Sequence, residues 1–197
     1  MSLREAKKER ARADLVQAAA ELFKARGFDA TRVADIAARA QLSHTTIHNH
    51  FAGKDGLATE WIRARADRVF EACADEAEQS PLRPALRRSL RAWCDALEAD
   101  APWLRQFWQR CRIGPLVTEA TGATRLVRAA QQRGDLRRDL PPEQLGGLLM
   151  AALVGATGEW LNADASADGL SAHAQRALDL VLDGARRRNE RVRPNVS

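Results

Sequence analysis

The sequence predicts an all-α protein of about nine helices, and three observations support this. Apolar residues recur three and four positions apart along most of the chain, which is the spacing of a buried helix face. No segment of the sequence shows the apolar–polar alternation of a strand, and there is no internal repeat or low-complexity tract. Glycine and proline residues interrupt the helical spacing and mark the expected helix ends.

The first 52 residues are predicted to contain three helices. The first covers residues 4–26 and ends at Gly27, because glycine readily adopts the backbone conformation that terminates a helix. Two short helices follow at 33–39 and 44–50. Ser43 is a good N-cap for the second of them, so the residues just before it form a turn.

The helix at 44–50 has a clear division between its two faces. Ile47 and Phe51 are four residues apart and face inward. The polar residues that remain face outward, and they are His44, Thr45, His48 and Asn49. A short helix with a polar outer face, supported at an angle by another short helix, fits the major groove of DNA.

The rest of the chain is predicted to add six helices. The long fourth helix begins near Lys54 and ends before Ser80 and Pro81, because proline disfavours helical backbone in the preceding residue. Proline residues at or near helix starts suit their fixed φ angle. On this basis the other helices are placed at 82–99, 102–112, 115–133, 142–163 and 168–188, with a loop near 133–142.

Two domains are expected from this order of elements together with the family resemblance given below. Residues 1–52 form a helix-turn-helix DNA-binding domain, with the motif itself at about 30–50, and residues 53–190 form a ligand-binding and dimerisation domain. Residues 1–54 hold ten Lys or Arg against six Asp or Glu, and so carry most of the net charge of +5. Such a basic segment attracts phosphate independently of DNA sequence.

Residues 12–57 resemble the amino-terminal domain of the tetracycline-repressor (TetR) family of bacterial transcriptional regulators. The match is carried by Leu15–Phe23, Gly27-Phe28, Asp35-Ile36-Ala37, Leu42-Ser43, Thr46–Phe51 and Lys54–Leu57. The resemblance implies a homodimeric repressor on a near-palindromic double-stranded operator, released by a small apolar or aromatic effector. Gln41, Thr45 and His48 depart from the family pattern, which usually has glycine, glycine and tyrosine there.

The resemblance and the outward face together suggest roles for individual DNA-binding residues. His44, Thr45 and Asn49 are predicted to contact base edges. The remaining positions correspond to phosphate contacts in the family, and they are Thr31, Arg32, Ser43, Thr46, His48, His50 and Lys54. Arg32 precedes the helix at 33–39, and its positive charge interacts unfavourably with the positive end of that helix dipole. A DNA phosphate nearby offsets this unfavourable interaction.

The last two predicted helices are candidates for a dimer interface. Small residues at Gly147, Ala151, Gly155 and Gly158 line one side of the helix at 142–163 and permit close helix packing. The pair can form half of a four-helix bundle with a second subunit, or it can simply close the chain's own core. The family resemblance favours the dimer.

The carboxy-terminal part of the chain concentrates large apolar side chains. Six of them are predicted to line an effector pocket: Trp93, Trp103, Phe107, Trp108, Met150 and Trp160. Apolar, aromatic-lined cavities are the usual small-molecule sites, whereas large aromatic residues also dominate ordinary cores. The sequence leaves pocket and core as alternatives.

Alternative functions rest on fewer residues. His44 and His48 are spaced to hold a metal ion, and Cys73, Cys94 and Cys111 can act in redox sensing or serve as buried apolar residues. No serine hydrolase, zinc protease or nucleotide-binding motif is present, so enzyme activity and cofactors are not expected. The charged amino terminus and the lack of a long apolar run predict a cytoplasmic protein without membrane association.

Overall fold

The computed structural model describes residues 2–77, 80–110, 121–163 and 169–185. Within these ranges every regular element is a helix, as the sequence predicts. The helices are α1 (Leu3–Arg26), α2 (Val33–Arg39), α3 (His44–His50), α4 (Gly53–Ala77), α5 (Leu82–Arg110), α6 (Thr121–Arg133), α7 (Pro142–Asn162) and α8 (Leu170–Ala185). None of them is long and apolar enough to cross a membrane.

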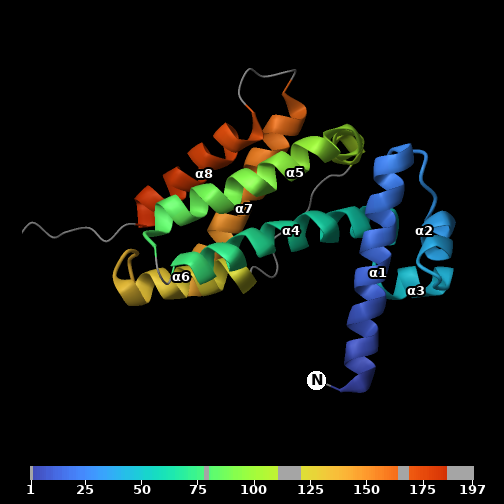
Figure 1. Ribbon diagram of the computed structural model, residues 1–197, viewed down its shortest axis with the longest axis horizontal. Coiled ribbons are helices and arrows are strands. Elements are labelled where there is room, and N and C mark those ends of the chain that lie inside the picture. The colour runs from blue at the N-terminus through green and yellow to red at the C-terminus, as the bar shows by residue number, and fades with distance from the viewer. Residues whose placement is uncertain (1, 78–79, 111–120, 164–168, 186–197) are drawn as a thin grey trace, which may run out of the picture.

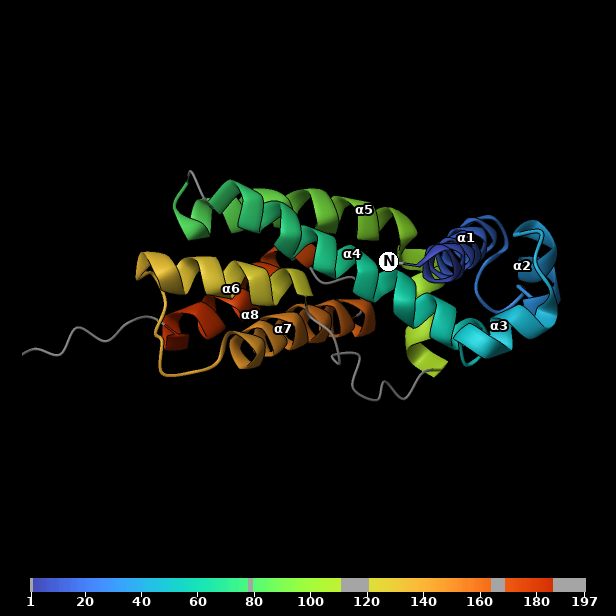
Figure 2. The same ribbon diagram turned by 90° about the horizontal axis from the view of Figure 1, so that it is seen from below.

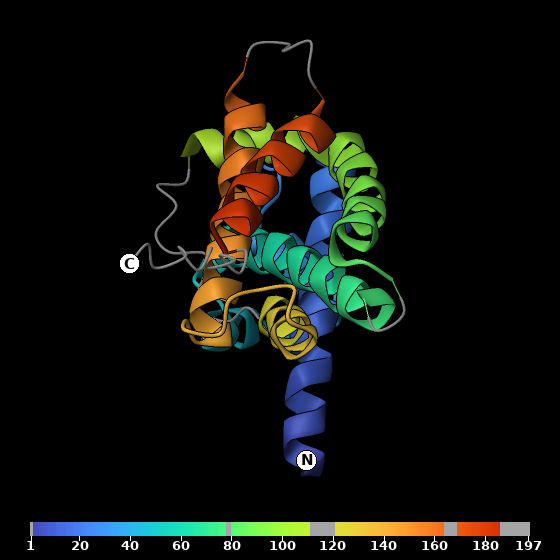
Figure 3. The ribbon, with the colours of Figure 1, turned by 90° about the vertical axis from the view of Figure 1, so that its left-hand side faces the viewer.

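Helices α1, α2 and α3 gather at one end of the molecule, and α4 connects them to a bundle of α5, α6, α7 and α8 (Figures 1 and 2). Helix α4 packs against α1 at one end and against α5 and α6 along its length. The amino-terminal half of α1 extends beyond its neighbours (Figure 3). Helix α4 is therefore the element shared by the two parts of the fold.

Local capping explains both ends of α1. The Ser2 hydroxyl accepts from the Glu5 backbone N–H, and the Glu5 carboxylate accepts from the Ser2 N–H, which satisfies two free donors at the helix start. At the other end, Gly27 has a φ of 83° and its N–H donates to the Phe23 carbonyl at 2.8 Å. The predicted stop at Gly27 is confirmed.

The turn between α2 and α3 contains a left-handed residue that is not glycine. Gln41 has a φ of 55°, a conformation that costs a residue with a Cβ about 1–2 kcal/mol. Leu42 then donates its N–H to the Ala37 carbonyl at 3.0 Å, which fixes the chain direction into α3. Ser43 caps α3, its hydroxyl accepting from the Thr46 N–H at 3.2 Å.

Helix α5 corrects one prediction. The sequence predicts separate helices at 82–99 and 102–112, whereas one helix runs through Pro102. Proline removes a helical hydrogen bond, usually at a cost of about 3 kcal/mol or more. Buried residues on both sides, among them Leu97, Trp103 and Leu104, keep the helix in one piece. The described residues consequently form eight helices, and the predicted start of a helix at 115 lies outside them.

Candidate nucleic-acid interface and effector region

Helix α3 is held to the fold by one face and leaves the other in solvent. Ile47 is fully buried and Phe51, which follows the helix, is 8% exposed. The residues predicted to face outward do so: His44, Thr45, His48 and Asn49 are all exposed. The rings of His44 and His48 lie 4.7 Å apart, between centroids, on that face.

The residues around this face form its border. Ser43 and Arg32 are exposed, and Thr46 and His50 are partly buried. Arg32 occupies the N-cap position of α2, and its side chain makes no capping hydrogen bond. Thr46 shares a 2.8 Å hydrogen bond with the Ser43 hydroxyl, so these two side chains also stabilise the start of α3. All four are accessible beside the outward face of α3.

Thr31 and Lys54 are placed differently from their predicted role in phosphate binding. Thr31 is 2% exposed, and its hydroxyl donates to the Gly27 carbonyl at 2.8 Å. The Lys54 ammonium donates to the carbonyls of Phe28 at 2.7 Å, Asp29 at 3.3 Å and Thr31 at 3.2 Å. An ammonium group has three donors, and all three are matched. Both side chains thus stabilise the loop between α1 and α2.

We expect Lys54→Met to destabilise the fold without removing a phosphate contact. The carbonyls left without donors cost roughly 1–3 kcal/mol for each group that stays buried, so the melting temperature falls. The salt dependence of DNA binding stays unchanged. Arg32→Ala, which removes an exposed cation, is the matched control and lowers the slope of log affinity against log salt by about 0.9 while leaving stability intact. A reduced salt slope for Lys54→Met contradicts the structural role.

The aromatic residues of α5 join the bundle to α1. Trp103 lies 5.1 Å from Phe23 and 5.0 Å from Trp61, between ring centroids. Phe107 lies 5.3 Å from Phe28, edge to face. Trp103 and Phe107 are 2% and 0% exposed, so these contacts are part of the core between the two ends of the molecule.

The other residues of the predicted pocket are also closely packed. Trp108 covers Gly158 so tightly that a Cβ built on the glycine lies 2.2 Å from the indole. Trp93 and Met150 are 5% and 1% exposed. Trp160 is 9% exposed, and the Arg105 guanidinium lies 5.5 Å from its ring centroid. For Trp103, Phe107 and Trp108, the contacts favour the core alternative.

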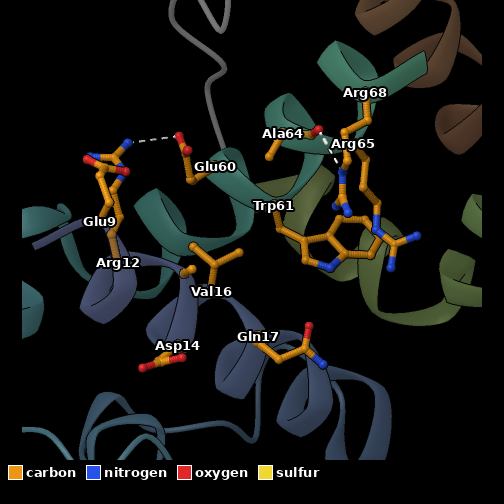
Figure 4. A pocket seen from close by; sticks show the side chains of 11 residues that line it. Glu9, Arg12, Asp14, Val16, Gln17, Glu60, Trp61, Ala64, Arg65 and Arg68 are labelled. Carbon is orange, nitrogen blue, oxygen red and sulfur yellow. Dashed lines mark hydrogen bonds and ion pairs between the residues drawn. The ribbon is translucent and has the colours of Figure 1, made fainter. Parts of the chain in front are cut away.

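A cavity lies elsewhere, between α1 and α4, where the sequence analysis did not place one. Its volume is about 480 Å³, and Trp61 lies between the Arg12–Glu60 ion pair and the side chains of Arg65 and Arg68 (Figure 4). The spacing of positions 61, 65 and 68 puts them on one helix face, a pattern that the sequence already contained. The sequence alone does not show which residues of α1 lie opposite positions 61, 65 and 68.

The cysteines of the described residues are inert by environment. Cys73 and Cys94 are buried and form no disulfide. Burial, with a smaller contribution from Glu76 at the first and Glu98 at the second, raises the pKa of both thiols to about 12. Because the thiolate is the reactive form, neither residue suits redox sensing. Cys111 lies outside the described residues.

Cys73 and Cys94 should resist alkylation in the folded protein. At pH 8 both thiols remain protonated and inaccessible, so iodoacetamide labels them only after denaturation in urea. Peptide mapping by mass spectrometry reads each cysteine separately. Labelling of either residue in the native protein at a rate near that in urea contradicts this assignment.

Metal binding has no support among the described residues, which contain no group of three or more His, Cys, Asp or Glu side chains able to hold an ion. This leaves His44 and His48 as a pair on the exposed face of α3.

Comparisons with known proteins agree with the fold and with the amino-terminal motif. Residues 15–60 match the sequence profile described as bacterial regulatory proteins, tetR family. The chain is 25% identical over 167 residues to the transcriptional repressor DhaR of a Mycobacterium species, covering 74% of this chain and 79% of DhaR. It is 33% identical over 118 residues to an HTH-type transcriptional repressor of Mycobacterium tuberculosis, covering 60% and 61% of the two chains.

Among solved structures, the chain is similar to Thermus thermophilus FadR, a TetR-family repressor crystallised with lauroyl-CoA. The TM-score is 0.66 at 21% identity, covering 88% of this chain and 94% of FadR, which supports the shared fold. The matched profile covers α1, α2, α3 and the start of α4, the elements that present the exposed face. Residues 15–60 therefore belong to the TetR family, and the chain is a TetR-like DNA-binding transcriptional regulator.

Proposed function

We propose that the protein is a homodimeric repressor that binds a near-palindromic operator and is released by a small apolar or aromatic effector. The observation that carries the DNA-binding part is helix α3, whose inner face is anchored by Ile47 while its outer face is polar and exposed. In a dimer, two such helices enter successive major grooves about 34 Å apart.

Within this interface, the exposed side chains of α3 divide into two groups. His44, Thr45 and Asn49 are proposed to read base edges, since amide and hydroxyl groups form hydrogen bonds with bases. Phosphate contacts are assigned to the residues that border the face, namely Arg32, Ser43, Thr46, His48 and His50.

Selection of bound fragments from random DNA tests this function directly. The expected product is a near-palindrome whose half-sites are about 10 base pairs apart. Asn49→Ala should change the bases preferred within each half-site, whereas Arg32→Ala should weaken all sequences about equally. Recovery of unrelated fragments without symmetry contradicts the proposal.

An exposed apolar face on α7 and α8 supports the dimer. These helices lie side by side (Figures 1 and 3). Leu148 and Leu180 are 49% and 77% exposed, and Ala151 and Gly155 are exposed between them in sequence. A Cβ built at Gly147 or Gly155 meets nothing within 4 Å, so the fold of one chain does not require glycine there. Close approach of a second helix provides the reason for small residues.

Gly158 belongs to a different contact from the one predicted. It shares the small-residue side of α7 with Gly147 and Gly155, but Trp108 of the same chain covers it. The proposed dimer face consequently excludes Gly158.

The effector response is proposed to act through the aromatic contacts between α5 and α1. Trp103 touches Phe23, and Phe107 touches Phe28, so a shift of α5 changes the support of α1. An effector that favours the shifted arrangement lowers operator affinity, and by linkage the operator lowers effector affinity by the same factor. The FadR structure with lauroyl-CoA shares this fold.

A further inference from the structure

The cavity between α1 and α4 contains a cation, Arg65, that forms no salt bridge with a carboxylate of the described residues. The Arg65 guanidinium lies 4.1 Å from the centroid of the Trp61 ring. In the part of the chain that the structure describes, its buried Nε has no hydrogen-bond acceptor. Partial burial lowers the pKa of Arg65 from its ordinary value, because the charge is incompletely solvated. An arginine nevertheless stays protonated at neutral pH.

The carboxylates near Arg65 are already paired with other cations. Glu60 bonds with Arg63 at 2.7 Å and with Arg12 at 3.0 Å. Although burial acts to raise it, the pKa of Glu60 is held below its ordinary value by these two arginines. Asp100 pairs with Lys24 of α1 at 3.6 Å. Among the described residues, Arg65 contacts the Trp61 ring, and Asp100 attracts its charge without forming a salt bridge with it.

A second charged cavity of similar size differs in how its charges are paired. It lies between α1 and α2 and has a volume of about 490 Å³. Its charges are matched within the cavity wall, with Arg39 2.7 Å from Glu21 and Arg26 3.6 Å from Asp35. The cavity at Arg65 is the better candidate for an anionic ligand.

The walls of the Arg65 cavity also contain apolar surface. Trp61 lies at its centre, with Val16 of α1 to one side of it (Figure 4). Ala13 and Ala64 add small side chains from α1 and α4. Arg68 lies beside Arg65 at one end, where its Nε donates to the Ala64 carbonyl at 3.2 Å (Figure 4). The site combines a flat apolar wall with two guanidinium groups.

We propose that this cavity binds a small aromatic carboxylate, with the carboxylate on Arg65 and Arg68 and the ring against Trp61 and Val16. Guanidinium groups recognise carboxylates through paired N–H donors, and a planar ring gains contact with the indole. A volume near 480 Å³ is within the range of small-molecule sites.

Such a ligand has a consequence for DNA binding, which rests on the proposed function. It contacts α1 and α4 together, and so it stabilises one angle between the helix that supports α3 and the helix that enters the bundle. Operator affinity changes if the DNA-bound dimer uses a different angle.

Binding is tested first without DNA, by isothermal titration and tryptophan fluorescence with 2-naphthoate, against its neutral analogue 2-naphthamide. The wild type should bind naphthoate at least tenfold more tightly than naphthamide, with quenching of the tryptophan emission. Arg65→Gln should lose at least tenfold in affinity, and so should Ala64→Phe, which fills the cavity without removing a charge. Arg128→Gln is the control, because Arg128 is exposed on α6 and pairs with Glu143.

Each outcome decides the inference. Equal affinity for the two probes, no binding of naphthoate at millimolar concentration, or unchanged binding by both cavity variants overturns the site. Binding of naphthoate that leaves operator affinity unaltered overturns its regulatory role. If the protein binds naphthoate but selects no operator, the proposed function fails while the site stands.

Discussion

Gly155→Leu is expected to convert the dimer to a monomer and to reduce operator affinity by about 100-fold or more. A dimer holds two recognition helices on one operator, and the loss of such linkage typically costs about 10²–10⁴ in overall affinity. Gly155 is exposed on α7, and a Cβ there meets nothing in its own chain. The larger side chain is therefore tolerated by the monomer and overfills the proposed contact between two copies.

Sedimentation and operator titration measure the two effects together. Ala72→Leu, which also places a leucine at an exposed position, here on α4, is the control and should stay dimeric. Circular dichroism should show equal helix content in both variants. A wild type that sediments as a monomer at micromolar concentration, or a Gly155→Leu variant that remains dimeric, removes α7 from the interface.

Of the substitutions proposed here, Phe107→Ala should lower the free energy of unfolding the most. Phe107 is fully buried and stacks edge to face on Phe28 at 5.3 Å. Removing a buried phenylalanine side chain costs about 3–5 kcal/mol. For a chain of this size that corresponds to a fall in melting temperature of roughly 6–20 °C. The loss is large because the cavity opens where α5 meets the loop after α1.

Because Phe107 packs against the loop after α1, its removal should also affect the local stability of that loop, which removal of another core residue should not. Phe70 is also fully buried, but it lies within α4, so Phe70→Ala is the matched control for lost volume. Hydrogen exchange should accelerate around Phe28 and Asp29 in Phe107→Ala more than in Phe70→Ala, because Gln106 next to it accepts from the Asp29 N–H at 3.2 Å. Equal exchange there in the two variants contradicts the proposed link from α5 to α1.

The amino-terminal helices show how much a local pattern can predict. The inward positions Ile36, Ile47 and Phe51 are buried as their spacing indicates, and Ser43 caps α3 as its residue type suggests. Gln41, at a position where the resembling family usually has glycine, adopts the left-handed conformation that glycine favours. These features depend on residues within about one helical turn of each other, so the sequence contains the information directly.

Lys54 and Thr31 show where such reasoning stops. Both are polar residues near the motif, and nothing local distinguishes a phosphate contact from a bond to a backbone carbonyl. The carbonyls that Lys54 bonds come from residues 28–31, more than twenty positions earlier in the chain. Only the packing of α4 beneath the loop after α1 brings donor and acceptors together.

Helix α7 also separates what the sequence determines from what the tertiary structure decides. The sequence determined that Gly147, Gly155 and Gly158 share that side, because a helix repeats every 3.6 residues. The tertiary structure decided that Trp108 of α5 covers Gly158 while Gly155 stays open. Likewise, the sequence put Trp61, Arg65 and Arg68 on one face of α4, and the crossing of α1 made that face a cavity. Helical periodicity is a property of neighbouring residues, whereas the cover over each face depends on where distant helices cross.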